Sequence, residues 1–268
     1  MALASQRWIG GSLVLILGFP LMATAAPGGK PIAPHLENPR YFLFEGKPTF
    51  LITSGEHYGA VLNLDFDFVP YLDELHRRGF NLTRTFTGTY REIPGSFKIV
   101  GNTLAPAPGR YAAPWARSQT PGAIDGGNKF DLGSWDEAYF RGLKTFCAAA
   151  AGRGIVVELV LFCPFYDEGL WTANPMHGPN NINNIGSMPR NEVFTLKHPD
   201  MVARHEAFGR RVQRLECPPP AVCELSLLGL GHRYAIRLEM VNPRHEPPLS
   251  LVPPHPAPSE DVAAPPDL

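Results

Sequence analysis

The chain has 268 residues, of which 44% are hydrophobic and 18% are charged, as in a folded globular protein with one large domain or two small ones. Its formal net charge at pH 7 is -1. This balance gives no electrostatic basis for binding nucleic acid or an anionic membrane surface.

The first 25 residues predict a signal peptide. Arg7 supplies a positive charge, Leu13 to Leu17 is an unbroken apolar run, and Ala23 to Ala25 offers small residues for cleavage. The apolar stretch is short for a membrane span and Pro20 interrupts it, so an uncleaved anchor is the second choice. We therefore expect a secreted or periplasmic protein that starts at Ala26 and has no membrane segment after cleavage.

The residues that follow predict alternating strands and helices. In chain order we expect a two-stranded hairpin (41–44 with 49–53), a helix (64–79), a strand (80–86) and a long loop (87–133). A second helix (134–152), a strand (155–162), a second long loop (163–197) and a last helix (198–215) follow.

The strand at 155–162 has the clearest pattern of this set. Seven of its eight residues are apolar, and only Glu158 interrupts them. A strand that is apolar on both faces is typical of a parallel sheet covered by helices. The helix before it is expected to begin at a Ser134 cap and to end at Gly152.

Alternating strands and helices predict a parallel α/β fold. Long loops follow the carboxyl ends of the strands, the returns from helix to strand are short, and no Gly-rich phosphate loop follows the first strand. These features favour a (β/α)8 barrel of the TIM type over an open doubly wound sheet, with a site at its carboxyl-terminal mouth. The hairpin at 41–53 could close the opposite end.

The loops at the predicted mouth combine aromatic rings, amides and carboxylates. Such a mixture suits sugars, whose rings have apolar CH faces and equatorial hydroxyl groups. The Asn-rich run 180–184 can equally be a surface loop, because Asn favours turns. No catalytic residue, metal ligand or cofactor is assigned. The candidate substrate-binding residues are Glu56, His57, Tyr58, Arg84, Tyr90, Trp115, Tyr166, Trp171 and Asn181.

Part of the chain resembles the amino-terminal half of cellulase-like (β/α)8 glycoside hydrolases, the clan that includes family five. The similarity spans roughly residues 37–215 and is carried by "ENPRYFLFEGKPTFLITSGEHYGAVLN", "GFNLTRTFTGTY", "NKFDLGSWDEAYF" and "GIVVELVLFCPFY". In that clan an Arg at the end of the second strand supports the catalytic carboxylates, and Arg84 matches it. The alternative role for Arg84 is an ion pair at the barrel end.

The resemblance also implies two catalytic carboxylates that are not found at the matching places. Members of the clan carry a general acid/base in an Asn-Glu pair after the fourth strand and a nucleophilic Glu after the seventh, and hydrolysis needs both. Beyond Leu215 the composition shifts abruptly toward Pro. We expect an incomplete barrel of about three β/α units in residues 26–216, and an irregular Pro-rich tail at 217–268 that reflects truncation or a changed reading frame.

Three functions remain open, and the expected partner is a polysaccharide or oligosaccharide. The chain is a glycoside hydrolase by ancestry that is inactive, a carbohydrate-binding protein without catalysis, or a hydrolase of other chemistry in which Glu56 and His57 hold a metal. Glu158 is expected to be buried and to need a partner such as Arg84. Cys147 and Cys163 are as readily explained by buried thiols as by disulfides.

We predict that limited proteolysis cuts the chain first beyond about residue 217. Pro removes backbone hydrogen-bond donors and the apolar periodicity ends there, so the tail is expected to lack packed structure. Mass spectrometry of the earliest fragments locates the cuts. A protease-resistant tail with slow amide exchange contradicts this prediction.

Overall fold

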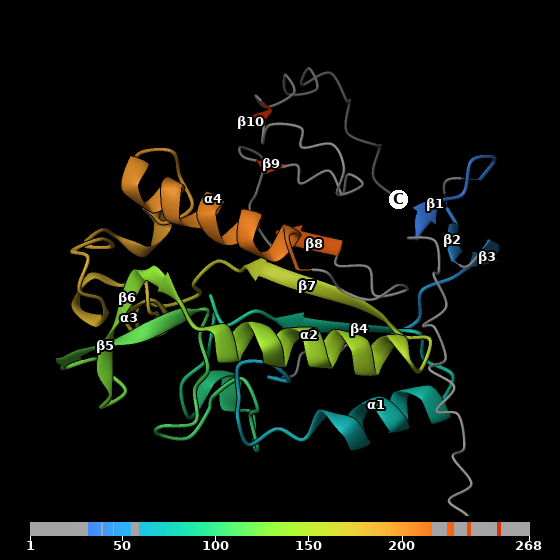
Figure 1. Cartoon of the computed structure of the whole chain (residues 1–268), viewed down its shortest axis with the longest axis horizontal. Coiled ribbons are helices and arrows are strands. Elements are labelled where there is room, and N and C mark those ends of the chain that lie inside the picture. Colours follow the sequence, from blue (N-terminus) through green and yellow to red (C-terminus); the bar gives the residue numbers. More distant parts are fainter. Residues whose placement is uncertain are drawn as a thin grey trace, which may run out of the picture.

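The computed structural model of the chain describes residues 32–38, 40–44, 46–54 and 59–215, and the backbone of three short strands at 224–227, 235–236 and 251–252. Within these residues the parallel strands lie at the centre, helices flank them, and long loops gather at one end (Figure 1). None of the helices described combines the length and the apolarity that crossing a membrane requires.

The centre of the fold is a parallel sheet in the order β4-β7-β8, with β4 at Leu82–Phe86, β7 at Val156–Phe162 and β8 at Glu224–Leu227. β4 pairs with β7 over its whole length without a register shift. Every residue of β7 is buried, so both faces of this apolar strand are covered, as the sequence predicts.

Three short strands are described within the tail beyond about residue 217, and its expected lack of packed structure stays a prediction. Residues 224–227 pair in parallel with β7 and extend the sheet by one strand. Two further short strands, β9 (Ala235–Ile236) and β10 (Leu251–Val252), form an antiparallel pair. All other tail residues lie outside the described part.

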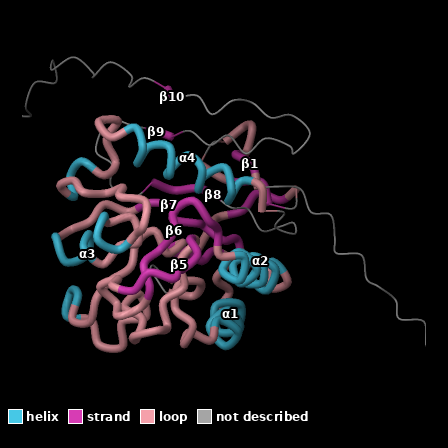
Figure 2. The backbone as a smooth tube through the Cα atoms, turned by 60° about the vertical axis from the view of Figure 1, so that its left-hand side comes forward, coloured by secondary structure: helices cyan, strands magenta, loops and turns pink. Residues whose placement is uncertain are grey.

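Two helices lie side by side on one flank of the strands (Figure 2), namely α1 at Phe68–Arg77 and α2 at Glu137–Ala151. The ring of Phe68 meets the ring of Phe146 edge-on with centroids 5.4 Å apart, which joins the two helices. The Tyr71 hydroxyl lies 2.7 Å from the hydroxyl of Thr83, which joins α1 to β4. The face of β4 that carries Thr83 is therefore the face covered by helix.

Aspartates begin both of these helices. The carboxylates of Asp67 and Asp136 each accept a hydrogen bond from a backbone N–H two residues further on. The second cap corrects the expected one, because Ser134 belongs to the preceding strand and its hydroxyl donates to Asp131. α1 ends just before Gly79, whose φ of +78° is the left-handed conformation that commonly terminates helices.

The loop expected at 87–133 contains an antiparallel hairpin that the sequence pattern did not reveal, formed by β5 (Trp115–Pro121) and β6 (Asn128–Trp135). The sequence Asp-Gly-Gly-Asn at 125–128 was the available signal, because Asp-Gly favours tight turns. The Arg117 guanidinium lies 3.7 Å from the ring centre of Phe130 and covers that ring.

The predicted hairpin at the amino-terminal side is present with different bounds. β1 (Ala33–Pro34), β2 (Phe42–Phe44) and β3 (Lys47–Thr49) form an antiparallel sheet. The stretch after β3, expected to continue the second strand, lies instead beside the start of β4. There the Ile52 carbonyl accepts hydrogen bonds from the backbone N–H groups of Asn81 and Leu82, each at 3.1 Å.

The last readable helix is α4, at Pro199–Gln213, and it begins after His198 as predicted. It packs against the end of β7, where Phe162 lies 5.9 Å from the ring of Phe208 and 4.6 Å from that of His205. The second long loop holds a short helix, α3 at Glu168–Thr172. The described residues thus contain several β/α units around three parallel strands, and the closure of an eight-stranded barrel is not seen within them.

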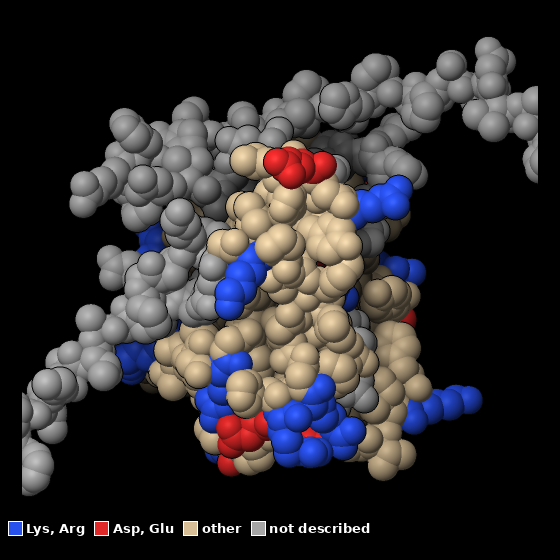
Figure 3. Space-filling view, turned by 90° about the vertical axis from the view of Figure 1, so that its right-hand side faces the viewer, with Lys and Arg blue, Asp and Glu red and all other residues tan. Residues whose placement is uncertain are grey.

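The two ends of the parallel strands differ in character. The arrows of β4 and β7 point toward the end where the long loops gather (Figure 1). Figure 3 faces the other end, where charged side chains of both signs collect along one border. α1 finishes in such a mixed group, because Glu74 lies 2.8 Å from Arg77 and 2.5 Å from Arg78. Because the long loops lie at one end and a mixed-charge surface lies at the other, the loop end is the expected position of a functional site.

We predict that acid weakens the fold through His205. Its imidazole is buried against Phe162 and Phe194, and burial lowers its pKa from 6.5 to about 3. The unfolded state therefore binds more protons between these values, so stability falls as pH drops below 6.5, by up to about 1.4 kcal/mol per pH unit. Urea unfolding at pH 7, 5.5 and 4 measures this loss.

The His205→Leu variant should show a flatter dependence of stability on pH. A matched control is Val69→Ala, since Val69 is an exposed residue of α1 without a titratable group, and this variant should keep the pH profile of the parent chain. An equally steep profile in His205→Leu would show that another group causes the acid sensitivity.

Candidate functional site

The candidate site lies where β4 and β7 end, because parallel strands bring their carboxyl ends to one edge. Two side-chain hydrogen bonds tie the loop after β4 to the end of β7. The Thr87 hydroxyl donates to the Val160 carbonyl at 3.0 Å, and the Thr89 hydroxyl donates to the Leu161 carbonyl. The two mouth loops therefore start from fixed positions.

An aromatic cluster fills this edge. Tyr90, from the loop after β4, lies 5.2 Å from Phe86, 6.3 Å from Phe165 and 6.4 Å from Tyr166, measured between ring centroids. Tyr90 is only 2% exposed, whereas Tyr166 is 59% exposed. A buried ring thus supports an exposed one, and Tyr166 is the member of this cluster that solvent or a ligand can reach.

A buried carboxylate lies beside the cluster. Glu92 accepts hydrogen bonds from the Tyr90 hydroxyl at 3.2 Å and from the Asn102 side-chain amide at 2.5 Å. Burial first, and then the charge of Glu92, raises the pKa of Tyr90 well above its usual value. Interaction with Cys163 first, and then burial, raises the pKa of Tyr166. Both phenols consequently stay protonated at neutral pH and can donate hydrogen bonds.

Arg84 and Glu158 form an ion pair across β4 and β7. The Nε of Arg84 donates to a carboxylate oxygen of Glu158 at 2.8 Å, and the two residues are direct register partners. Their side chains are 30% and 10% exposed. The expected partnership is confirmed, although Arg84 lies in the middle of β4 rather than at its end. Because the neighbouring Thr83 faces α1, alternation places Arg84 on the opposite face of the strand.

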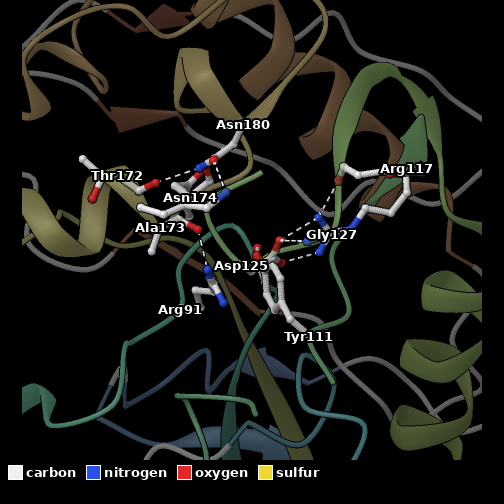
Figure 4. A network of polar contacts seen from close by, with 12 residues as sticks. Arg91, Tyr111, Arg117, Asp125, Gly127, Thr172, Ala173, Asn174 and Asn180 are labelled. Carbon is white, nitrogen blue, oxygen red and sulfur yellow. Dashed lines mark hydrogen bonds and ion pairs between the residues drawn. The ribbon is translucent and has the colours of Figure 1, made fainter. Parts of the chain in front are cut away.

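The Asn-rich loop is internal rather than part of an open rim. Asn180 donates from its amide to the carbonyls of Thr172 and Asn174 at 2.7 and 2.8 Å (Figure 4). Asn181 is 2% exposed and donates to the carbonyls of His177 and Ile185 at 3.0 and 2.9 Å. These side-chain amides bond to backbone groups inside the loop. The run therefore fits the alternative in which its asparagines form a loop, and Asn181 is not exposed for the substrate contact expected of it.

A second set of contacts joins this loop to the hairpin of β5 and β6 (Figure 4). The Arg117 guanidinium binds both carboxylate oxygens of Asp125, at 3.1 and 2.5 Å. The Asp125 carboxyl is raised in pKa by burial, but the bonds from Arg117 outweigh this and the net pKa is lowered. Ile124 donates its backbone N–H to Asn180, and Arg91 donates to the Ala173 carbonyl at 2.9 Å. The loops at the mouth therefore hold one another in place.

The two tryptophans expected at the rim lie in the core. Trp115 and Trp171 are each 1% exposed. Trp115 packs between Trp135 and Phe208, and the indole N–H of Trp171 donates to the Met188 carbonyl at 3.0 Å. Neither ring face is free to stack on a sugar, and the same is true of the buried Tyr90. Of the aromatic residues expected to bind substrate, Tyr166 alone is exposed within residues 59–215.

Glu56, His57 and Tyr58 lie outside the described residues, so their expected role in binding stays a prediction. Across the described ranges, no group of three or more His, Cys, Asp and Glu side chains could hold a metal ion. Cys147 and Cys163 are both buried thiols, in agreement with the thiol alternative. Burial raises the pKa of Cys163 to about 11, which keeps this thiol unreactive at neutral pH.

One exposed aromatic residue at the mouth was missed. Phe97 lies 5.6 Å from Tyr166, ring centre to ring centre, and is 55% exposed. Its sequence context offered a signal, since "GSFKIVG" places apolar residues between two glycines in a loop that has no helical or strand periodicity. The exposed surface of the site is thus formed by Tyr166 and Phe97, with Glu92 nearby.

Comparison with solved structures finds chains named as glycoside hydrolases. A glycoside hydrolase from Bacteroides vulgatus ATCC 8482 is 14% identical, with a TM-score of 0.41 over 76% of this chain and 39% of that chain. A glycoside hydrolase family 5 mannosidase from Rhizomucor miehei is 13% identical, with a TM-score of 0.40 over 72% and 45%. An endo-1,4-beta-mannanase from the same organism is 13% identical, with a TM-score of 0.35 over 69% and 42%.

This chain spans less than half the length of each of these three structures. No protein-family model and no curated protein matches it. Similarity at this level transfers no residue role.

We predict that Arg84→Met destabilises the fold by roughly 1–3 kcal/mol, because Glu158 is then a nearly buried carboxylate without its charged partner. The double variant Arg84→Met/Glu158→Gln should lose less than the sum of the two single changes. Urea unfolding of the four chains measures this coupling.

A control for this cycle is Arg110→Met, which removes a solvent-exposed pair with Asp65 and should change stability by less than about 1 kcal/mol. Strict additivity of the Arg84 and Glu158 changes would show that the ion pair contributes nothing to the fold.

Proposed function

We propose that this chain is an exported protein of glycoside-hydrolase type that binds a polysaccharide or oligosaccharide where β4 and β7 end, and that it does not hydrolyse it. The observation that carries the proposal is Tyr166, an exposed ring at the carboxyl-terminal edge of a parallel sheet, supported from below by the buried ring of Tyr90. Aromatic faces of this kind suit the apolar faces of sugar rings. Export would follow cleavage before Ala26.

The described carboxylates near the site favour binding over catalysis. Hydrolysis of a glycosidic bond needs one carboxylic acid to protonate the leaving oxygen and a second carboxylate to attack or to activate water. Glu158 is engaged by Arg84, and Glu92 is engaged by Tyr90 and Asn102. Each therefore has a structural partner that it would have to give up before it could serve a substrate.

The small number of strands around the site is a second reason to expect binding rather than catalysis. Catalytic groups must be held within a fraction of an ångström of the reacting atoms, and this requires walls on more than one side of the sugar. Stacking on an exposed ring needs only one wall. The three parallel strands described here, with an exposed aromatic at their edge, are thus better suited to holding a glycan than to cleaving it.

We predict measurable binding and no turnover when the purified mature chain is tested against β-glucans, mannans, xylans and aryl glycosides. Without a correctly placed pair of carboxylates, the chain lacks general acid catalysis, which contributes roughly two to four orders of magnitude to the rate of hydrolysis. Affinity electrophoresis and calorimetry measure binding, and release of reducing sugar or aryl alcohol measures turnover.

The Glu56→Gln variant is the control for the part of the site that lies outside the described residues. Turnover that Glu56→Gln abolishes would overturn the proposal and move the catalytic centre to the loop at 54–59. Activity lost with a chelator would instead favour a metal-dependent hydrolase, and absence of any glycan binding would refute the proposed function as a whole.

A further inference from the structure

The loop between Gly95 and Gly101 exposes an unusual number of apolar side chains next to Tyr166. Phe97 is 55% exposed, Ile99 is 51% exposed and Val100 is 98% exposed. Large apolar side chains gathered on one exposed loop often mark a binding surface. The aromatic member of the loop is the one that touches the candidate site, because the Phe97 ring lies 5.6 Å from that of Tyr166 at an interplanar angle of 85°.

The backbone of this loop is strained where it presents Phe97. Phe97 and Lys98 have φ angles of 53° and 58°, the left-handed region that side chains with a Cβ rarely occupy. Strain of this kind persists only where other interactions hold it, and it tends to occur at functional sites. Here the Ser96 hydroxyl accepts the Ile93 backbone N–H at 3.2 Å, and the Lys98 N–H donates to the Gly95 carbonyl at 3.1 Å.

Glu92 and Asn102 brace the base of the same loop. The Glu92 backbone N–H donates to the Leu104 carbonyl at 2.8 Å, and the Asn102 side chain both accepts the Leu104 N–H at 3.0 Å and donates to the Glu92 carboxylate. The other Glu92 oxygen accepts from Tyr90, on which Tyr166 rests. One buried carboxylate therefore positions both exposed rings relative to each other.

The negative charge of Glu92 near Tyr166 affects which class of sugar can bind to the two exposed rings. Glu92 is 6% exposed and takes part in none of the ion pairs of the described residues. Its carboxylate accepts a hydrogen bond from Tyr90, whose ring lies 6.4 Å from that of Tyr166, so one residue separates this negative charge from the exposed ring. A uronic acid placed on these rings would be repelled by Glu92 unless the exposed Lys98 of the same loop offset that repulsion, whereas an uncharged sugar responds to neither charge.

We infer that Phe97 and Tyr166 form a subsite for one pyranose ring of a neutral glycan, with Glu92 as the residue that positions the two rings. Two rings at nearly a right angle make a corner, so a sugar that stacks on one ring meets the edge of the other. The Tyr166 hydroxyl keeps its proton at neutral pH and can donate a hydrogen bond. The inference rests on the proposed function, because it names the place and the class of the glycan bound.

The decisive variant is Phe97→Gly. Glycine adopts a positive φ without strain, so this change should leave the unfolding temperature unchanged or raise it while it removes the ring. We expect the affinity for mannohexaose or cellohexaose, whichever binds the parent chain more tightly, to fall about tenfold, as suits the loss of one buried aromatic face. Isothermal titration calorimetry and thermal unfolding measure the two quantities.

Three further measurements complete the test. Tyr166→Ala should lower the affinity to a similar degree, Phe97→Tyr should keep it, and oligogalacturonate should bind the parent chain more weakly than the neutral hexaoses. The matched control is Val69→Ala, because Val69 is an exposed apolar residue on α1 that has no place in the subsite. It should leave the affinity unchanged.

The outcomes separate this inference from the proposed function. Parent-like affinity in both Phe97→Gly and Tyr166→Ala overturns the subsite and leaves glycan binding elsewhere on the chain intact. Equal or tighter binding of oligogalacturonate overturns the neutral class. A parent chain that binds neither the hexaoses nor any of the β-glucans, mannans and xylans refutes the proposed function and the subsite together, and would point to a protein partner for the apolar loop.

Discussion

The parallel pairing of β4 with β7 brings the starts of both mouth loops to one edge of the sheet. Because the two strands run without a register shift, Arg84 stands opposite Glu158 and both strands end at one edge. The threonines that follow β4 extend the match by bonding to the last carbonyls of β7. A slip of one residue would turn Arg84 toward the helices and separate the charges, so the ion pair and the register reinforce each other.

Local rules predict the elements of this fold well where the pattern is long and regular. The buried strand at 156–162 follows from its apolar run, and α4 follows from His198 and a proline at its first turn. The hairpin of β5 and β6 was not predicted, because its strands mix polar and apolar residues without clear alternation. The pairing of two antiparallel strands depends on side-chain contacts between the strands, and composition alone does not reveal these contacts. Asp136 caps α2 in place of the expected Ser134, and both residue types are suitable helix caps, so the sequence did not distinguish between them.

The site was harder to predict than the fold. The ion pair of Arg84 with Glu158 follows from chemistry alone, since a carboxylate within an apolar strand needs a cation. Exposure of aromatic residues does not follow from sequence, and Trp115 and Trp171 prove to be core residues. Whether a tryptophan in a loop turns inward depends on what the rest of the molecule leaves open. Phe97 was overlooked for the same reason, because nothing local shows that its loop projects outward.

The buried amides of the second mouth loop have a consequence for how this sequence can drift. Asn180 and Asn181 bond to the main-chain carbonyls of their neighbours and not to side chains. An exposed neighbour such as Ile182 can therefore be replaced as long as the path of the chain is kept, whereas neither asparagine can be exchanged without leaving several polar groups unpaired at once. Among descendants of this gene, we expect the two amides to persist while the exposed positions around them vary.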